Sequence, residues 1–447
     1  MTDSKPQLFT SKQLRVLIFP LIAECFLSCS LGIADTMMIS SIGEAAMSGV
    51  ALVDMLNVLI INFFGGLATG GAVIAAQFIG KKNSRRASDC ATEIIMLSLF
   101  VGVLIGGVML LLRRQVMSLF FGSIEADVMA AGVRYLSYSA CSYPFIAIYS
   151  ASSALFRAMG NSKISMFSSL MMNIMNIFGN ATLIFGFGLG IDGAAIATMI
   201  SRFAAMLFLL IRISMKSETI HASFRHYRPN PGIIKKILYI GIPSSFENSI
   251  FQLGRVVVVS IISLFGTTQI AANSVAGNLD GFGCIPGQAL QLAMITVIGQ
   301  CIGAGDDNQT MYYARKLMKI AMIAGAAINA AVMISMPLVL KLYTLSDEAR
   351  ELTVILVIIN CISASILWPS AFVLPNALKA AGDVKFTMVV SIVSMITLRV
   401  MFSYVLGVIF GLGAIGVWIS MVLDWVLRAS CFIARFRSRK WLHGSMV

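Results

Sequence analysis

Long apolar runs separated by short polar breaks follow one another along the whole chain. Each run reaches the roughly 20 residues that an α-helix needs to cross a bilayer. The pattern predicts an all-α membrane protein whose twelve transmembrane helices cover residues 14–39, 48–78, 90–112, 128–156, 164–186, 190–214, 234–265, 270–300, 314–340, 352–378, 386–409 and 412–433. The apolar run at the N-terminus continues without a small-residue cleavage site, which favours a retained first helix over a signal peptide.

The basic residues predict how these helices are oriented. Among 447 residues, 58% are hydrophobic and 12% charged, with 33 Lys and Arg against 20 Asp and Glu. Of the 33, 25 fall on the side of the two termini when loops are assigned alternately, and only Arg113, Arg114, Lys341 and Arg350 fall on the other. Basic loops stay in the cytoplasm, so both termini are expected there, and the net charge of +13 needs no nucleic-acid partner.

An internal repeat divides the chain into halves. At an offset of 223 residues, Glu24 falls on Glu247, and residues 188–193 (GLGIDG) fall on residues 411–416 (GLGAIG). Two six-helix bundles that enter from the same side predict a pseudo-twofold axis along the membrane normal. The N-terminal bundle is expected at residues 1–215, a cytoplasmic linker at residues 216–236, and the C-terminal bundle at residues 237–447.

Enzyme and metal chemistry have little support in the sequence. The eight cysteines form no CxxC pair, and the chain has three histidines, so no zinc or iron–sulfur site is expected. No GxxxxGK[ST] motif exists, which disfavours ATP-driven transport. We therefore expect no structural metal, no cofactor and no catalytic residues.

Ionisable groups within apolar spans are functional candidates, because burying a charge in lipid is costly. Six acids fall there: Glu24, Asp35, Asp54, Glu247, Asp280 and Asp424. Glu24 and Asp35 lie about 20° apart around one helix and ~16 Å apart along it, a spacing that suits an ion route. The alternative is that an arginine on a neighbouring helix neutralises each carboxylate, or that the carboxylate faces an aqueous vestibule and has no coupling role.

The second half offers another set of charged residues. Glu247, Asp280 and Arg255 could attract a substrate or form a second coupling site, with Glu24 as the counterpart of Glu247 in the first half. The alternative is a structural ion pair between Arg255 and Asp280. Arg202 and Asp424 occupy nearly equivalent places in the two halves and are expected to be structural.

Several motifs together resemble one transporter family. They are residues 35–39 (DTMMI) with Ile42-Gly43, residues 70–80 (GGAVIAAQFIG), residues 156–161 (FRAMGN), residues 241–243 (GIP) and residues 299–306 (GQCIGAGD). In order and spacing they resemble the multidrug and toxic compound extrusion (MATE) family. The resemblance implies two six-helix bundles around a central cavity, and cation-coupled export of amphipathic, often cationic compounds.

The resemblance also implies a cation site in the N-terminal bundle, formed by Asp35, Asn176, Asn180 and Thr198. One branch of the family usually has Asp at the position of Asn180, so Asp35 is left as the cluster's single carboxylate. A site of this kind suits protons or sodium, and the ion stays open. The other main branch has a carboxylate in a later helix, but residues 366–376 contain none.

The sequence thus predicts a secondary antiporter in the inner membrane that exchanges protons or sodium for a small amphipathic substrate by alternating access, acting as a monomer. A lipid-linked oligosaccharide flippase of a related fold is the alternative, although it would need a cavity rich in Arg or Lys. A receptor or scaffold without transport activity is the third possibility.

Overall fold

The computed structural model describes residues 7–122, 124–215, 218–225, 227–343, 345–442 and 446–447. Every regular element in this part of the chain is helical. Lys5 and Lys216, which the charge count assigned to the cytoplasmic side, lie outside it. The chain forms two compact units: Arg15–Ser245, and Phe246–Val447 together with the N-terminal stretch to Leu14. The predicted domain limits stay a prediction.

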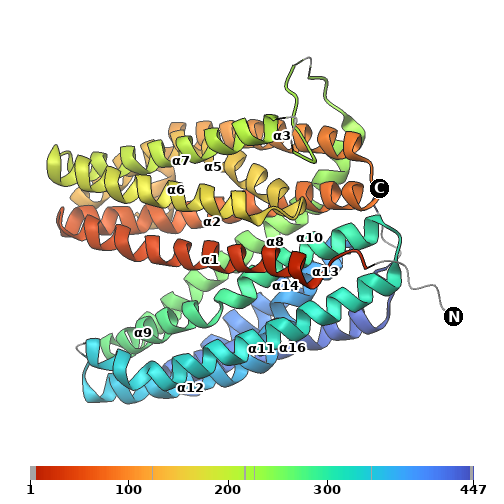
Figure 1. Ribbon diagram of the computed structural model, residues 1–447. Helices are drawn as coiled ribbons and strands as arrows, with labels where there is room; N and C mark the ends of the chain where they lie inside the picture. Colours follow the sequence, from red (N-terminus) through yellow and green to blue (C-terminus); the bar gives the residue numbers. More distant parts are fainter. Residues whose placement is uncertain (1–6, 123, 216–217, 226, 344, 443–445) are drawn as a thin grey trace. The chain divides into compact units, whose positions relative to one another are not determined.

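The first unit contains long helices packed side by side (Figure 1). They are α1 (Ser11–Ser40, from Arg15 on), α2 (Glu44–Gly80), α3 (Ser84–Leu111), α4 (Arg113–Phe121), α5 (Ala126–Ala158), α6 (Ser162–Asn180) with its π-helical continuation η1 (Ala181–Gly186), and α7 (Gly190–Ser214). Helix α5 lies at the centre of this unit, against α2, α3 and α7.

The second unit begins within α8 (Pro231–Ser263). Its other helices are α9 (Thr267–Gly283), α10 (Ile285–Gly303), α11 (Asp307–Val339), η2 (Leu340–Leu342), α12 (Asp347–Trp368), η3 (Pro369–Val373), α13 (Leu374–Ala380), α14 (Val384–Ser394), η4 (Met395–Met401), α15 (Phe402–Tyr404), η5 (Val405–Ile409) and α16 (Gly413–Arg437). Helix α8 starts at a proline, which suits a first helical turn because its nitrogen needs no intrahelical partner. The last part of the predicted linker, residues 231–236, therefore belongs to α8.

Each predicted span coincides with one helix or a run of consecutive helices. Ten of these stretches in the described part of the chain are long and apolar enough to cross a membrane. The count of twelve crossings stays a prediction, since α5 and α6 are not among these ten stretches. Helix α4 was not predicted, since Arg113 and Arg114 indicated a loop.

The internal repeat is visible in the backbone. The Phe187 amide donates to the Thr182 carbonyl at 3.0 Å, and 223 residues later the Phe410 amide donates to the Val405 carbonyl at 2.9 Å. In both halves the chain leaves a π-helical segment and turns at a glycine in the left-handed region, with φ of 66° at Gly188 and 69° at Gly411. Since L-residues with a Cβ rarely adopt this conformation, the repeated glycines fix the same hairpin in both halves.

Helices α2 and α8 approach closely within the first unit. A Cβ placed on Gly66 would lie 2.3 Å from the Ser245 nitrogen, and one on Gly70 would lie 2.4 Å from the Ile237 carbonyl oxygen. The Ser245 hydroxyl donates to the Phe63 carbonyl at 2.7 Å. Small residues four apart allow this backbone contact, as in other membrane helix pairs.

The segment before α8 is held against α3. Glu93 is buried, and its carboxylate accepts from the Tyr227 hydroxyl and from the Asn230 amide, both at 2.7 Å. The amides of His221 and Ser223 donate to Ser88 and Thr92 of α3, respectively. The predicted linker is therefore docked along this helix in its described part.

Candidate functional site

The structure brings the four residues of the predicted cation site into one hydrogen-bonded chain. The Asn180 side-chain amide donates to the Asp35 carboxylate at 2.8 Å and to the Asn176 oxygen at 3.3 Å. The Asn176 amide in turn donates to the Thr198 hydroxyl at 3.1 Å. The site therefore joins α1, α6 and α7 within one unit. The side chains of Thr36 and Met37, beside Asp35 in the first motif, lie outside the described residues.

A polar stripe on α6 positions the two asparagines. Apart from one adjacent pair of serines, its members recur every three or four residues, and all are buried: Ser162, Ser165, Ser168, Ser169, Asn173, Asn176 and Asn180. This spacing places them on one helix face. A polar face on a helix in a membrane is stable when it packs against other helices, so the stripe indicates that α6 turns this face into the unit.

The site's oxygen atoms suit a small hard cation. The Asn180 side-chain oxygen is buried and has no hydrogen-bond partner within the described residues. With the Asp35 carboxylate it offers the carboxylate and amide oxygens that such ions prefer. The described residues contain no cluster of three or more His, Cys, Asp or Glu side chains that could hold a metal ion.

A second polar group lies on α2 and α5 of the same unit. Asn57 donates to the Asp54 carboxylate at 3.1 Å and accepts from the Tyr143 hydroxyl at 2.9 Å. On α7, Arg202 donates to the Ser142 hydroxyl at 2.7 Å. The sequence singled out Asp54 and Arg202 as charges within spans. It missed Asn57 and Tyr143. For Asn57 the available signal was its position three residues after Asp54, on the same helix face.

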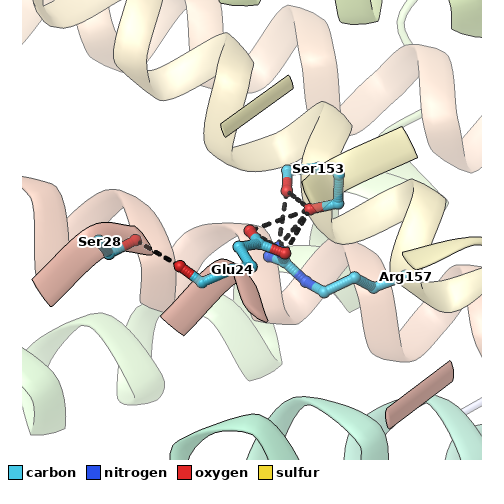
Figure 2. Close-up of polar contacts among 5 residues, drawn as sticks. Glu24, Ser28, Ser153 and Arg157 are labelled. Atoms are coloured by element: carbon cyan, nitrogen blue, oxygen red, sulfur yellow. Dashed lines mark hydrogen bonds and ion pairs between the residues drawn. The ribbon is translucent and has the colours of Figure 1, made fainter. Parts of the chain in front are cut away.

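Glu24 forms a partly buried ion pair near the middle of α1. Figure 2 shows Arg157 of α5 turned toward the Glu24 carboxylate. The two groups lie 3.2 Å apart, and the Ser165 hydroxyl donates to the same carboxylate at 2.9 Å. Arg157 also donates to the Ser153 hydroxyl at 2.6 Å. The alternative weighed for Glu24, neutralisation by a neighbouring arginine, describes this geometry.

Glu247 has the equivalent arrangement in the second unit. Lys379 lies 3.0 Å from its carboxylate, and the Ser391 hydroxyl donates to it at 2.9 Å. Arg157 and Lys379 were counted from sequence among the loop residues, but each is the ion-pair partner of an acid on the first helix of its half. The sequence contained a signal for this shared role, because Arg157 and Lys379 are the first residues of the matched segments 157–160 and 379–382.

Asp280 and Arg255 are not paired with each other. Asp280 accepts from Asn360 at 2.9 Å and from the Cys284 thiol at 3.3 Å. Within the described residues Arg255 forms no ion pair, so the predicted alternative of an Arg255–Asp280 pair is wrong. Helix α12 packs against α9 and places the Asn360 side-chain amide beside the carboxylate instead.

Asp424 of α16 is fully buried and contacts two arginines and a serine. Its carboxylate is 2.9 Å from Arg428, accepts from the Ser394 hydroxyl, and is 3.7 Å from Arg399. Both guanidinium groups lie over the Phe251 ring, at 5.2 Å for Arg428 and 5.8 Å for Arg399. Ion pairing is the arrangement expected for a structural Asp424.

Known proteins resemble the chain along almost its whole length. The family model MatE matches residues 20–182 and again residues 243–405, and the two matches begin at the repeat offset of 223. An uncharacterized transporter, YisQ of Bacillus subtilis, is 27% identical, and the alignment covers 96% of this chain and 95% of that protein. A probable multidrug resistance protein, NorM of Thermotoga maritima, is 25% identical over 96% of this chain and 93% of its own.

Solved structures show the same fold. The outward-facing structure of a multidrug resistance MATE family transporter of the MOP superfamily has a TM-score of 0.89 with 22% identity, covering 96% of this chain and 95% of that one. The fold, the repeat and the two family-model matches agree with one another. The chain is a multi-pass membrane protein that belongs to the MatE family, the multidrug and toxic compound extrusion transporters.

Proposed function

We propose that the protein is a secondary antiporter that exports amphipathic, often cationic compounds in exchange for protons or sodium. The observation that carries this proposal is the contact between Asp35 and Asn180, whose side-chain oxygen has no hydrogen-bond partner within the described residues. Relatives named as multidrug resistance proteins support drug export. The charge asymmetry supports cytoplasmic termini and location in the inner membrane.

Binding of the ion at Asp35 would change the electrostatics of the first unit. An ionised Asp35 lies near Asp54 and Arg202, so neutralising it removes one of two neighbouring negative charges. A cationic substrate would be attracted to the ionised state and released from the neutralised one. Competition between ion and substrate for the same negative charge then supplies the coupling, as alternating access requires.

The choice between the two ions depends on the oxygen atoms around Asp35. A proton needs only the carboxylate, whereas sodium also needs neutral oxygen ligands. Asn180 and Thr198 supply such oxygens, and neither adds a negative charge. The site therefore supports either ion, with sodium bound through a single formal charge.

Reconstitution in liposomes tests the proposal. Flux of a cationic dye is measured with a proton gradient alone, with a sodium gradient alone, and with neither. We expect uphill dye movement under one imposed gradient and only downhill exchange without it. Dye movement that ignores both gradients, while the protein remains folded, would rule out the antiport mechanism.

A further inference from the structure

The start of α11 in the second unit corresponds, through the internal repeat, to the start of α3 in the first. The two helices begin 223 residues apart, at Ser84 and Asp307. Both are capped by the preceding residue, since the side chains of Asn83 and Asp306 each accept from the backbone amide three residues later. Positions along the first turns of α3 and α11 can therefore be compared directly.

The side chains that hold the segment before α8 against α3 have no counterparts of the same chemistry on α11. On α3 these side chains are Ser88, Thr92 and Glu93. The residues 223 positions later are Met311, Arg315 and Lys316. A lysine thus occupies the position of the buried acid, so this face of α11 suits a partner of opposite charge.

A cavity of about 940 Å³ lies on this face of α11 and is also lined by residues that follow α16. Its charged and aromatic lining residues are Asp307, Tyr312, Arg315, Lys316, Lys319 and Arg439. The four bases outnumber the single acid, and none of the four forms an ion pair within the described residues. Since like charges held close together repel one another, the cavity attracts an anion.

The basic face of α11 continues into exposed apolar side chains. The Lys316 Nζ lies 5.5 Å from the centre of the Tyr312 ring. Tyr312, Lys316, Lys319 and Ile323 fall within about 60° around the helix. Ile323 and its neighbour Met322 are exposed. A tyrosine and lysines beside an apolar surface are typical of the interface between membrane and water, so the anion that fits here carries an apolar part.

We propose that this cavity binds the phosphate group of an anionic phospholipid, whose acyl chains lie along Met322 and Ile323. Guanidinium and ammonium groups are the donors that bind phosphate in proteins. The bases of α11 belong to the side of the termini in the charge count, which is the side where basic clusters meet anionic lipid. Free phosphate has the same charged group but no apolar part. The site is separate from the predicted cation site at Asp35, which belongs to the other unit.

Lipid binding to the purified full chain in a neutral detergent tests the proposal. Phosphatidylglycerol, phosphatidylcholine with the same acyl chains, and inorganic phosphate are titrated separately. Native mass spectrometry counts the bound lipid, and thermal unfolding measures protection. The proteins are wild type, Lys316→Gln, Lys316→Glu and Arg439→Gln, with Lys235→Gln as the control. Lys235 is an exposed base on α8, outside this cavity.

We expect the wild type to bind phosphatidylglycerol more tightly than phosphatidylcholine. Lys316→Gln and Arg439→Gln should each weaken the binding of phosphatidylglycerol about fivefold, the size expected for one basic residue facing anionic lipid. Lys316→Glu, which introduces the acid of the first unit at this position, should weaken it further, and Lys235→Gln should leave it unchanged.

Two results would overturn the proposal while leaving the export function standing. One is equal binding of the two lipids by the wild type, or unchanged binding of phosphatidylglycerol by Lys316→Glu. The other is protection by inorganic phosphate as strong as that by phosphatidylglycerol at the same concentration, which would assign the cavity to a soluble anion.

Discussion

Asn180 donates its side-chain amide to the Asp35 carboxylate at 2.8 Å, while its own side-chain oxygen is buried without a hydrogen-bond partner within the described residues. One side chain thus holds the only carboxylate of the cluster in place and offers a neutral oxygen next to it. The arrangement would serve a bound cation as two adjacent ligands.

Replacing Asn180 separates these two contributions. Asn180→Leu removes both the donor and the oxygen, and we expect about tenfold weaker binding of sodium, since a neutral oxygen ligand beside Asp35 is lost. Asn180→Asp keeps the oxygen and adds a second carboxylate, so sodium should bind more tightly than to the wild type. Ion-dependent protection from thermal unfolding measures both. Equal ion affinity in all three proteins would contradict a role for this residue.

The ion pair between Glu24 and Arg157 is expected to stabilise the first unit. Removal of one partner leaves a partly buried charge without compensation, so Glu24→Gln or Arg157→Met should each lower the free energy of unfolding by about 2 kcal/mol. The double variant should recover part of the loss, because no unpaired charge remains. A double-mutant cycle on thermal unfolding gives the coupling energy, and additive losses would show that the two side chains do not interact.

The close contact of α2 with α8 leads to a prediction about neighbouring glycines. Gly66→Ala would place a methyl group 2.3 Å from the Ser245 nitrogen, so the helices must separate, at a cost of about 2 kcal/mol. Gly65→Ala is the matched control, because a Cβ there meets nothing within 4 Å. Thermal stability of the purified variants checks this. Equal stability of the two would mean that the helices do not pack as closely as described.

Docking of the linker on α3 can be tested by proteolysis. Arg225 is an exposed cleavage site for trypsin in this segment. Glu93→Gln removes the charged acceptor of Tyr227 and Asn230, so the segment should be cut about tenfold faster. Asp89→Asn, on the exposed side of the same helix, is the control. Unchanged cleavage in Glu93→Gln would contradict the docking.

The same contact has a defined pH dependence. Burial, followed by the hydrogen bond to Glu93, raises the pKa of Tyr227 from its ordinary value of 10.0 to about 12. Because the folded-state pKa lies above the unfolded one, the contact should contribute fully below pH 10 and be lost as pH rises toward 12. Protection of the linker from proteolysis should therefore be constant between neutral pH and about pH 9.

Local patterns predicted the helices well, because the apolar run of a membrane span and the basic residues beside it are neighbours in the sequence. The repeat was equally visible, since Gly188 and Gly411 must each adopt the same unusual backbone conformation. The short helix α4 was missed, because its first two residues, Arg113 and Arg114, indicated a loop.

Partners of buried charges were harder to predict. Lys379 lies far along the chain from Glu247, and only folding brings the two together. The same holds for Asp280 and Asn360, where an amide occupies the place expected for Arg255. The cluster of Asp35, Asn176, Asn180 and Thr198 was expected only through the family resemblance, because hydropathy and spacing within one helix say nothing about contacts between helices.

The most direct test of the proposed mechanism compares wild type with Asp35→Asn in liposomes, with Glu44→Gln, an exposed acid at the start of α2, as the control. Uphill flux of a cationic dye under an imposed proton or sodium gradient is measured beside gradient-free exchange of the same dye. We predict that Asp35→Asn abolishes the gradient-driven flux while exchange continues, and that Glu44→Gln retains both. Undiminished gradient-driven flux in Asp35→Asn would contradict the proposal that Asp35 couples the ion to transport.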